Sequence, residues 1–228
     1  MLKRQKIYLI ILILTYVYFF IFENQLGQII TLGLSMPLLI MAFAPLLYQR
    51  INVPIKYRYI PILISMVLPN VLFSIHIDWF TDEYHYFLIT MLLSLILLLT
   101  RYNNLKEAIK ISTLLEPISK LTCFMQMVKL TLIIIGEELL FRVFYYNLIS
   151  NPSFWHIILN GLVFACYHHF NRFAHNQYKF IDYVYHFLLS IILGYCYLSF
   201  DKIFAPIVFG HITYNFTNYI ILLQRGRK

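Results

Sequence analysis

Long apolar stretches separated by short polar segments dominate the sequence. A helix that crosses a bilayer needs about 20 mostly apolar residues. This pattern recurs along the chain and predicts about eight spanning helices, at Ile7–Phe22, Ile29–Tyr48, Tyr59–Ile75, Tyr86–Thr100, Leu130–Ile149, Phe154–Phe170, Ile181–Phe200 and Ile203–Leu223. We therefore expect an all-α, polytopic membrane protein in which residues 1–228 form a single integral membrane domain.

The segment 101–120, between the fourth and fifth apolar stretches, has a different pattern. Leu105, Ile109 and Leu115 are interspersed with Lys106 and Lys110. This spacing is typical of an amphipathic helix that lies on a membrane surface. A plain connecting loop fits the segment equally well, and the sequence leaves both interpretations open.

Composition supports the membrane class and explains the basic charge. Hydrophobic residues make up 61% of the chain and charged residues only 12%, which a soluble domain of this size does not show. The net charge is +8. If the N-terminus is cytoplasmic, all lysines and arginines except Arg142 and Lys202 fall on the cytoplasmic side, which satisfies the positive-inside rule. The sequence thus predicts a multi-pass protein of the cell membrane with both termini in the cytoplasm, in contact with the lipid bilayer and with no nucleic-acid partner.

Three ionisable residues interrupt the fifth apolar stretch. Each of Glu137, Glu138 and Arg142 costs about 2.5–3.5 kcal/mol near the middle of a membrane helix. Glu138 and Arg142 are four residues apart and can form an ion pair on one helix face. Glu137 lies about 100° further around the helix, which leaves it for chemistry. The alternative is a buried ion pair that only fixes helix packing.

Later stretches also carry polar residues that a purely apolar helix would not need. His168 lies near one end of the sixth stretch. His211 and Asn215, four residues apart, are expected on one face of the eighth, and Gly210 before them permits close helix approach. A single histidine in such a helix is often a hydrogen-bonded packing residue. Together with the glutamates, however, these residues predict a polar intramembrane cavity.

The polar residues form three short motifs in a fixed order. They are Glu-Glu-x-x-x-Arg at Glu137–Arg142, Phe-x-x-x-His at Phe164–His168 and His-x-x-x-Asn at His211–Asn215. This arrangement resembles the CPBP family, which contains the type II CAAX prenyl endopeptidases and many bacterial Abi-type membrane proteins. The resemblance is specific from Leu130 to Tyr219, within a catalytic core at 130–223. The first four apolar stretches match that family only in being hydrophobic.

The resemblance implies an eight-helix intramembrane peptidase whose site residues carry over by position. Glu137 would act as general base on a water molecule held by His168. His211 and Asn215 would polarise the scissile carbonyl and stabilise the oxyanion, while Glu138 and Arg142 would orient the site. These roles agree with the needs of peptide hydrolysis, which are a base, a held water and donors aimed at the developing oxyanion.

The sequence leaves the cofactor question with two answers. We expect no cofactor, but two histidines and a carboxylate could instead hold a divalent metal such as zinc. The His-Glu-x-x-His pattern of many zinc peptidases is missing from the helix that carries the glutamates.

The expected function is an intramembrane endopeptidase that hydrolyses a peptide bond of a membrane-associated peptide or protein. The alternative is a non-catalytic bacteriocin-immunity or regulatory binding protein of the same family. A proton-relaying transporter is disfavoured because the sequence shows no paired halves. The composition, rich in Tyr, Ile, Lys and Asn, is typical of an AT-rich bacterial genome. The sequence fixes neither the substrate nor the oligomeric state.

Overall fold

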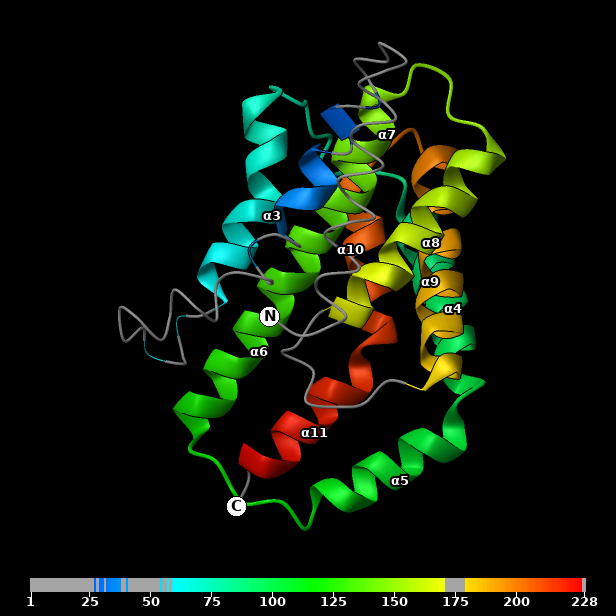
Figure 1. Ribbon diagram of the computed structural model, residues 1–228. Helices are drawn as coiled ribbons and strands as arrows, with labels where there is room; N and C mark the ends of the chain where they lie inside the picture. The colour runs from blue at the N-terminus through cyan, green and yellow to red at the C-terminus, as the bar shows by residue number, and fades with distance from the viewer. Residues whose placement is uncertain are drawn as a thin grey trace. The chain divides into compact units, whose positions relative to one another are not determined.

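The computed structural model describes residues 59–170 and 179–226, together with a few positions between 27 and 57 (Figure 1). These parts are helical and contain no strand, which confirms the all-α prediction. The predicted span Ile7–Phe22 and most of Ile29–Tyr48 lie outside the described residues. The chain divides into two compact units. The first unit comprises Met1–His76 with Leu139–Ser190, and the second comprises Ile77–Glu138 with Ile191–Lys228.

Few of the described helices could cross a membrane on length and composition alone. Helix α9 (Phe180–Ser199) is long and apolar enough to do so. Helices α4 (Tyr84–Leu99) and α5 (Tyr102–Ser112) meet the criterion only as a pair that bends by 80°. The other apolar helices, α3 (Ile60–Leu72), α8 (Phe154–Phe170) and α10 (Phe204–Tyr214), are shorter. Within the described residues, the prediction of eight spans is therefore not confirmed.

Four predicted elements agree closely with the structure. Helix α8 has the predicted bounds, and α3, α4 and α9 begin and end within three residues of theirs. The segment 101–120 contains the helix α5, so a plain loop is the wrong alternative. Hydrophobic periodicity locates such helices well because one long apolar run corresponds to one helix.

The fifth predicted span, Leu130–Ile149, is wrong at its start and in its form. Helix α6 (Lys120–Glu138) starts ten residues earlier, and a π-helical segment η2 (Leu139–Phe144) and a short helix α7 (Tyr145–Leu148) follow it. The early start has a local cause at Ser119. Its Oγ accepts the backbone N–H of Thr122 at 3.1 Å, which is an N-cap bond that satisfies a donor of the first turn.

The eighth predicted span, Ile203–Leu223, is two helices and not one. Helix α10 ends at Tyr214, and α11 (Phe216–Gly226) begins after Asn215. The side-chain oxygen of Asn215 accepts a hydrogen bond from Asn218 Nδ2 at 2.9 Å. The backbone carbonyl of Asn215 accepts a second one from the backbone N–H of Asn218. Asparagine favours such local bonds over helical ones, so the break falls at this residue.

In the second unit, α10 packs closely against α4. Thr90 Oγ1 donates to the Pro206 carbonyl at 2.9 Å, and Gly210 lies where a Cβ atom would meet Leu193, Ser94 and Thr90. The first turn of α10 is anchored as well, because the carbonyls of Asp78 and Trp79 accept the N–H groups of Phe204 and Ala205. These contacts fix the helix that carries His211.

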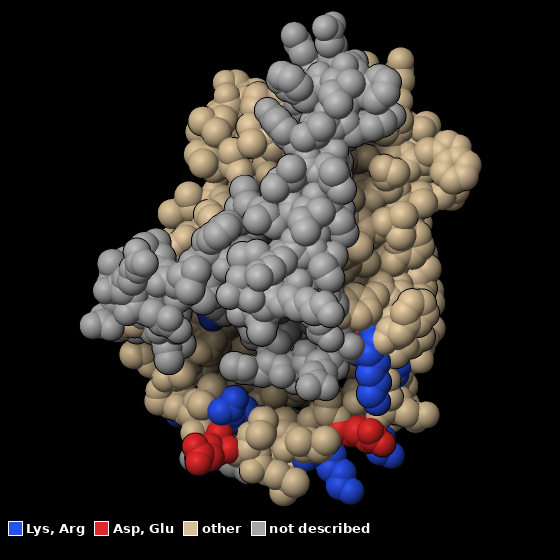
Figure 2. Space-filling view, viewed as in Figure 1, with Lys and Arg blue, Asp and Glu red and all other residues tan. Residues whose placement is uncertain are grey.

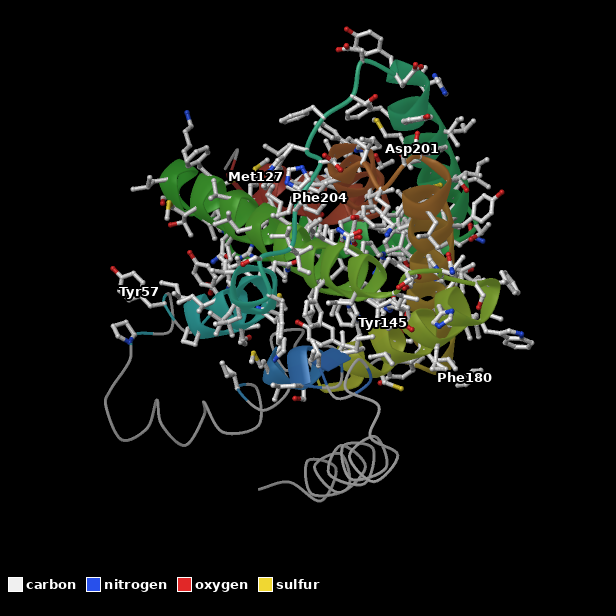
Figure 3. The ribbon with its side chains drawn as sticks, turned by 90° about the horizontal axis from the view of Figure 1, so that it is seen from above. Tyr57, Met127, Tyr145, Phe180, Asp201 and Phe204 are labelled. Atoms are coloured by element: carbon white, nitrogen blue, oxygen red, sulfur yellow. The ribbon has the colours of Figure 1, made fainter. Side chains whose placement is uncertain are left out.

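A tight turn joins α9 to α10 without a glycine. Asp201 and Lys202 both have a positive φ, 51° and 61°, in the left-handed region that L residues seldom adopt. The N–H of Lys202 reaches back to the Tyr197 carbonyl at 2.9 Å, which closes the end of α9. Asp201 marks this turn in Figure 3, and Phe204 marks the start of α10.

Several charged residues of the second unit lie on or next to α5 and α11. In Figure 1 these helices lie side by side, and Figure 2 shows Lys, Arg, Asp and Glu side chains at the same end of the view. Ser112 donates to Gln224 Oε1 at 2.6 Å, and Arg225 Nε donates to the Glu116 carbonyl at 3.1 Å. These bonds connect the two helices and the segment between α5 and α6.

Candidate active site

The two glutamates lie at the end of α6 and are buried. Only 4% of Glu137 and none of Glu138 is exposed. Buried carboxylates need a partner, because an isolated charge away from water is strongly unfavourable. In the second unit, that partner comes from α10.

The imidazole of His211 lies between the two carboxylates. Its Nδ1 is 2.6 Å from Glu138 Oε1, and its Nε2 is 3.8 Å from Glu137 Oε2. Only 2% of His211 is exposed. The structure therefore brings together three of the predicted site residues around one ring.

The two sides of the ring have different geometry. The 2.6 Å contact is a short hydrogen bond between a ring nitrogen and a carboxylate, in which Nδ1–H donates and Glu138 accepts. Such a bond fixes the tautomer and the orientation of a histidine. The 3.8 Å separation on the Nε2 side is too long for a direct hydrogen bond. Glu138 thus holds the ring, and Nε2 is the nitrogen that faces Glu137.

Asn215 lies one turn after His211, at the break between α10 and α11. It is half-buried, and its Nδ2 donates to the His211 carbonyl at 3.3 Å. The predicted continuous helix is wrong, because α10 ends at Tyr214 and Asn215 is its C-cap. That the two side chains face the same way stays a prediction. The role of Asn215 as a donor to an oxyanion stays a prediction.

In the first unit, Arg142 and His168 both contact the motif phenylalanine, Phe164. Arg142 belongs to η2 and is fully buried, with its Cζ 4.9 Å from the centroid of the Phe164 ring. This is cation–π geometry. The ring of His168 lies 4.5 Å from the same phenylalanine, and its Nδ1–H donates to the Phe164 carbonyl at 2.9 Å. The phenylalanine and histidine of the motif Phe-x-x-x-His therefore pack against each other, and Arg142 packs on the same phenylalanine.

His186 was not among the predicted site residues. Its ring lies 4.0 Å from that of His168, with an angle of 32° between the ring planes. Its Nδ1–H donates to the Asp182 carbonyl at 2.6 Å. No motif signals this contact, because it depends on how α8 and α9 pack.

Two buried asparagines were also missed. Asn70 on α3 donates from Nδ2 to the Leu139 carbonyl at 3.0 Å, and Asn160 on α8 donates to the Phe141 carbonyl at 2.8 Å. An amide in the middle of an apolar helix is itself a signal, because polar groups inside a membrane are unfavourable unless they have a purpose.

The predicted residues are thus divided between the two units. Glu137, Glu138 and His211 meet in the second unit, whereas Arg142 and His168 meet around Phe164 in the first. That His168 and Glu137 share one cavity stays a prediction, as does the ion pair between Glu138 and Arg142.

The zinc alternative concerns the same residues. Among the described residues, no group of three or more His, Cys, Asp and Glu side chains is placed to hold a metal ion. Glu137 and His211 supply two donors, whereas a catalytic zinc site uses three protein ligands. The predicted zinc alternative also needs His168, which belongs to the other unit, so it stays a prediction. The chemistry proposed for the site uses the described side chains and water.

Comparison with known proteins places the motif-bearing segment in a family. No curated protein and no solved structure is detectably similar to the chain. Residues 119–217 match the family model described as type II CAAX prenyl endopeptidase Rce1-like. This segment begins just before α6, ends just after Asn215 and contains all three motifs. The family is one of membrane-embedded proteases. The match over residues 119–217 supports the CAAX-protease-like family that the three motifs predicted.

Proposed function

We propose that the chain is an intramembrane endopeptidase that hydrolyses a peptide bond of a membrane-associated peptide or protein with water activated by Glu137. The observation that carries this proposal is the buried cluster of Glu137, His211 and Glu138. Because Nε2 and the carboxylate are 3.8 Å apart, a reacting oxygen that lies beside the line between them can be within hydrogen-bonding distance of both. A cluster that served only as an ion pair would need one carboxylate and not two.

Glu137 acts as the general base. It takes a proton from a water molecule while the water oxygen attacks the carbonyl carbon of the substrate. The carbonyl oxygen becomes an oxyanion, which needs a donor that is already in place. When the C–N bond breaks, the proton on Glu137 passes to the leaving amine. Water is thereby consumed, and a carboxylic acid and an amine are formed.

His211 supplies the donor to the oxyanion. In its imidazolium form the ring donates from Nδ1 to Glu138 and from Nε2 toward the reacting carbonyl. Glu138 keeps the ring in this orientation through the 2.6 Å bond. Because all three side chains are buried, their charges act in a low-dielectric site where such donors are worth several kcal/mol.

The remaining family positions take supporting roles. His168 holds the attacking water, Asn215 adds a second donor to the oxyanion, and Arg142 orients the site. These roles follow from the family motifs, and the buried positions of Arg142 and His168 support them.

A comparison of four forms of the full-length protein tests the proposal. They are the wild type, Glu137→Gln, His168→Ala and, as a matched control, Glu107→Gln on the exposed face of α5. Each is produced at the same level in the same host, and new peptide termini in membranes and medium are compared by mass spectrometry. We expect the wild type and the control to give the same cleavage products. The amount of these products should be at least about 10²-fold lower with both site variants.

Two outcomes would contradict the proposal. The same products from Glu137→Gln as from the wild type would show that the carboxylate is not the base. Unchanged peptides combined with altered bacteriocin resistance would instead indicate a binding protein. A chelator added to the purified wild type tests the zinc alternative, since activity that is lost with the chelator and restored by zinc would assign a metal to the reaction.

A further inference from the structure

The π-helical segment η2 is an irregular piece of backbone at the motif that carries Arg142. All six of its residues, Leu139–Phe144, are buried. A π-helix bonds each N–H to the carbonyl five residues back, whereas the α-helix before it uses the carbonyl four residues back. Backbone carbonyls at such a junction need other donors, because an unpaired carbonyl in a buried place is unfavourable. In the first unit, two side chains supply those donors.

Asn70 and Asn160 each donate to one carbonyl of η2. Asn70 Nδ2 lies 3.0 Å from the Leu139 oxygen, and Asn160 Nδ2 lies 2.8 Å from the Phe141 oxygen. A carbonyl oxygen only accepts, so the amide groups must point their nitrogens at it. Both asparagines are buried. They come from α3 and α8, so helices distant in the sequence hold the same short segment.

These amides are more than packing residues. Asn70 Oδ1 is buried and meets no hydrogen-bond donor among the described residues. Leucine has a similar volume and no polar atom, so it would avoid the free-energy cost of this unsatisfied oxygen. Asn160 Oδ1 accepts a hydrogen bond from Ser190 Oγ at 3.4 Å, and Ser190 is fully buried. What the amides contribute specifically is the two bonds to the η2 backbone.

The Asn160 bond belongs to a longer contact between α8 and η2. Asn160, Phe164 and His168 follow each other at intervals of four, so they share one face of α8. Asn160 holds the Phe141 carbonyl, and Phe164 receives the next residue, Arg142, on its ring. The rings of Phe141 and Phe164 also meet, 5.0 Å apart. The motif Phe-x-x-x-His therefore extends one turn back to Asn160.

We propose that Asn70 and Asn160 are positioning residues of the reaction: they hold the Leu139 and Phe141 carbonyls and so keep η2 in the form that seats Arg142 on Phe164, beside His168. This inference rests on the proposed peptidase function. Neither asparagine touches the reacting atoms. Both act through the backbone of η2, which follows directly after Glu138 in the sequence.

The test replaces each donor while keeping the volume of the side chain. The variants are Asn70→Leu and Asn160→Leu, and the matched control is Asn147→Leu. Asn147 also donates to a backbone carbonyl, that of His76 at 3.3 Å, but it lies just outside η2 and is half-buried. Ser190→Ala is a milder change, because it removes only the hydroxyl that orients Asn160.

The first measurement is amide hydrogen exchange of residues 139–148 in the purified full-length protein in detergent. We expect exchange about tenfold faster in Asn70→Leu and Asn160→Leu than in the wild type and Asn147→Leu. Ser190→Ala should shift exchange in the same direction by less. Should Asn160→Leu fail to fold, Ser190→Ala and Asn70→Leu still give the answer. If the exchange rates in Asn70→Leu and Ser190→Ala equal the rate in Asn147→Leu, the inference is overturned, whatever the activity of these variants.

The second measurement is turnover of a synthetic peptide that spans the cleavage site found with the wild type. We expect kcat to fall by roughly 10²-fold in the asparagine variants, because the site is displaced. KM should stay within about twofold, because only the transition state loses stabilisation. Wild-type kcat with faster exchange would overturn the positioning role. A wild type whose products do not depend on Glu137 would instead overturn the proposed function, so the two failures are distinguishable.

Discussion

The two histidines of the family motifs are held in opposite ways. His211, in the second unit, is held by charge: one carboxylate bonds its Nδ1 at 2.6 Å, and another lies 3.8 Å from its Nε2. His168, in the first unit, is held by shape: its Nδ1 donates to a backbone carbonyl, and its ring packs between those of Phe164 and His186. Arg142, which also belongs to the first unit, is likewise placed on the face of Phe164.

This difference indicates which changes each histidine should tolerate. A short bond between buried charged groups has one direction, and its loss leaves a buried group without its partner. Ring packing is spread over many atoms, and it responds to the volume and flatness of the neighbours more than to their charge. His211 should therefore be sensitive to charge substitutions and His168 to shape substitutions.

The largest effect is expected from Glu138→Gln, which keeps the shape beside His211 and removes the charge. A neutral amide no longer stabilises the imidazolium form that the proposed mechanism requires, and the corresponding change behind a catalytic histidine lowers turnover by roughly 10⁴-fold. Stability should change little, because the amide can still bond to the ring. Glu138→Ala should in addition lower the free energy of unfolding by about 3–5 kcal/mol.

Cleavage of a peptide that spans the wild-type cleavage site measures the effect on turnover. Thermal unfolding in detergent, monitored by size-exclusion chromatography, measures the effect on stability. A Glu138→Gln variant with wild-type turnover would show that charge does not hold His211.

The second largest effect is expected from Phe164→Leu, which changes shape without changing charge. The variant loses the cation–π contact with Arg142 and the ring contacts with His168 and Phe141. We expect the free energy of unfolding to fall by about 2–4 kcal/mol. Phe164→Tyr, which keeps the ring, should retain more of the stability than Phe164→Leu. Equal losses in the two variants would indicate that ring packing is not what holds this side of the site.

The sequence located the members of both groups but not how each is held. Glu137, Glu138, Arg142 and the two histidines stand out because ionisable residues are rare in apolar helices. The bond from Glu138 to His211 and the stack of His186 on His168 depend on helix packing, which residue spacing does not reveal.

The fold was predictable to a similar extent. Apolar runs gave the positions of α3, α4, α8 and α9, because each run forms one helix. They did not give the break at Asn215 or the π-helical form of Leu139–Phe144. Both features coincide with individual side-chain hydrogen bonds, made by Asn215 with Asn218 in the first case and by Asn70 and Asn160 in the second.

A smaller effect is expected from substitutions of Gly210, which directly precedes His211 in α10. A Cβ atom there would lie 3.0 Å from Leu193 Cδ2 and 3.2 Å from Ser94 Oγ and Thr90 Cβ. Gly210→Ala requires shifts of a few tenths of an ångström, partly offset by the helix propensity of alanine of about 1 kcal/mol. We therefore expect a net loss below about 1 kcal/mol for alanine and of about 1–3 kcal/mol for Gly210→Leu. Chemical denaturation of the two variants measures both values, and a leucine variant as stable as the wild type would contradict the close packing of α10 on α4.

The smallest effect is expected from Glu83→Gln, which tests whether burial gives the Glu138 contact its strength. Glu83 and His85 also pair a carboxylate with a histidine Nδ1, at 3.1 Å, but the two side chains are 59% and 57% exposed. Water and salt screen such a pair, so it contributes about 0–1 kcal/mol, and less as salt increases. Glu83→Gln should leave both the unfolding temperature and the turnover close to those of the wild type. If Glu83→Gln instead lowered turnover as much as Glu138→Gln, the effect of the latter could not be assigned to a buried carboxylate that orients His211.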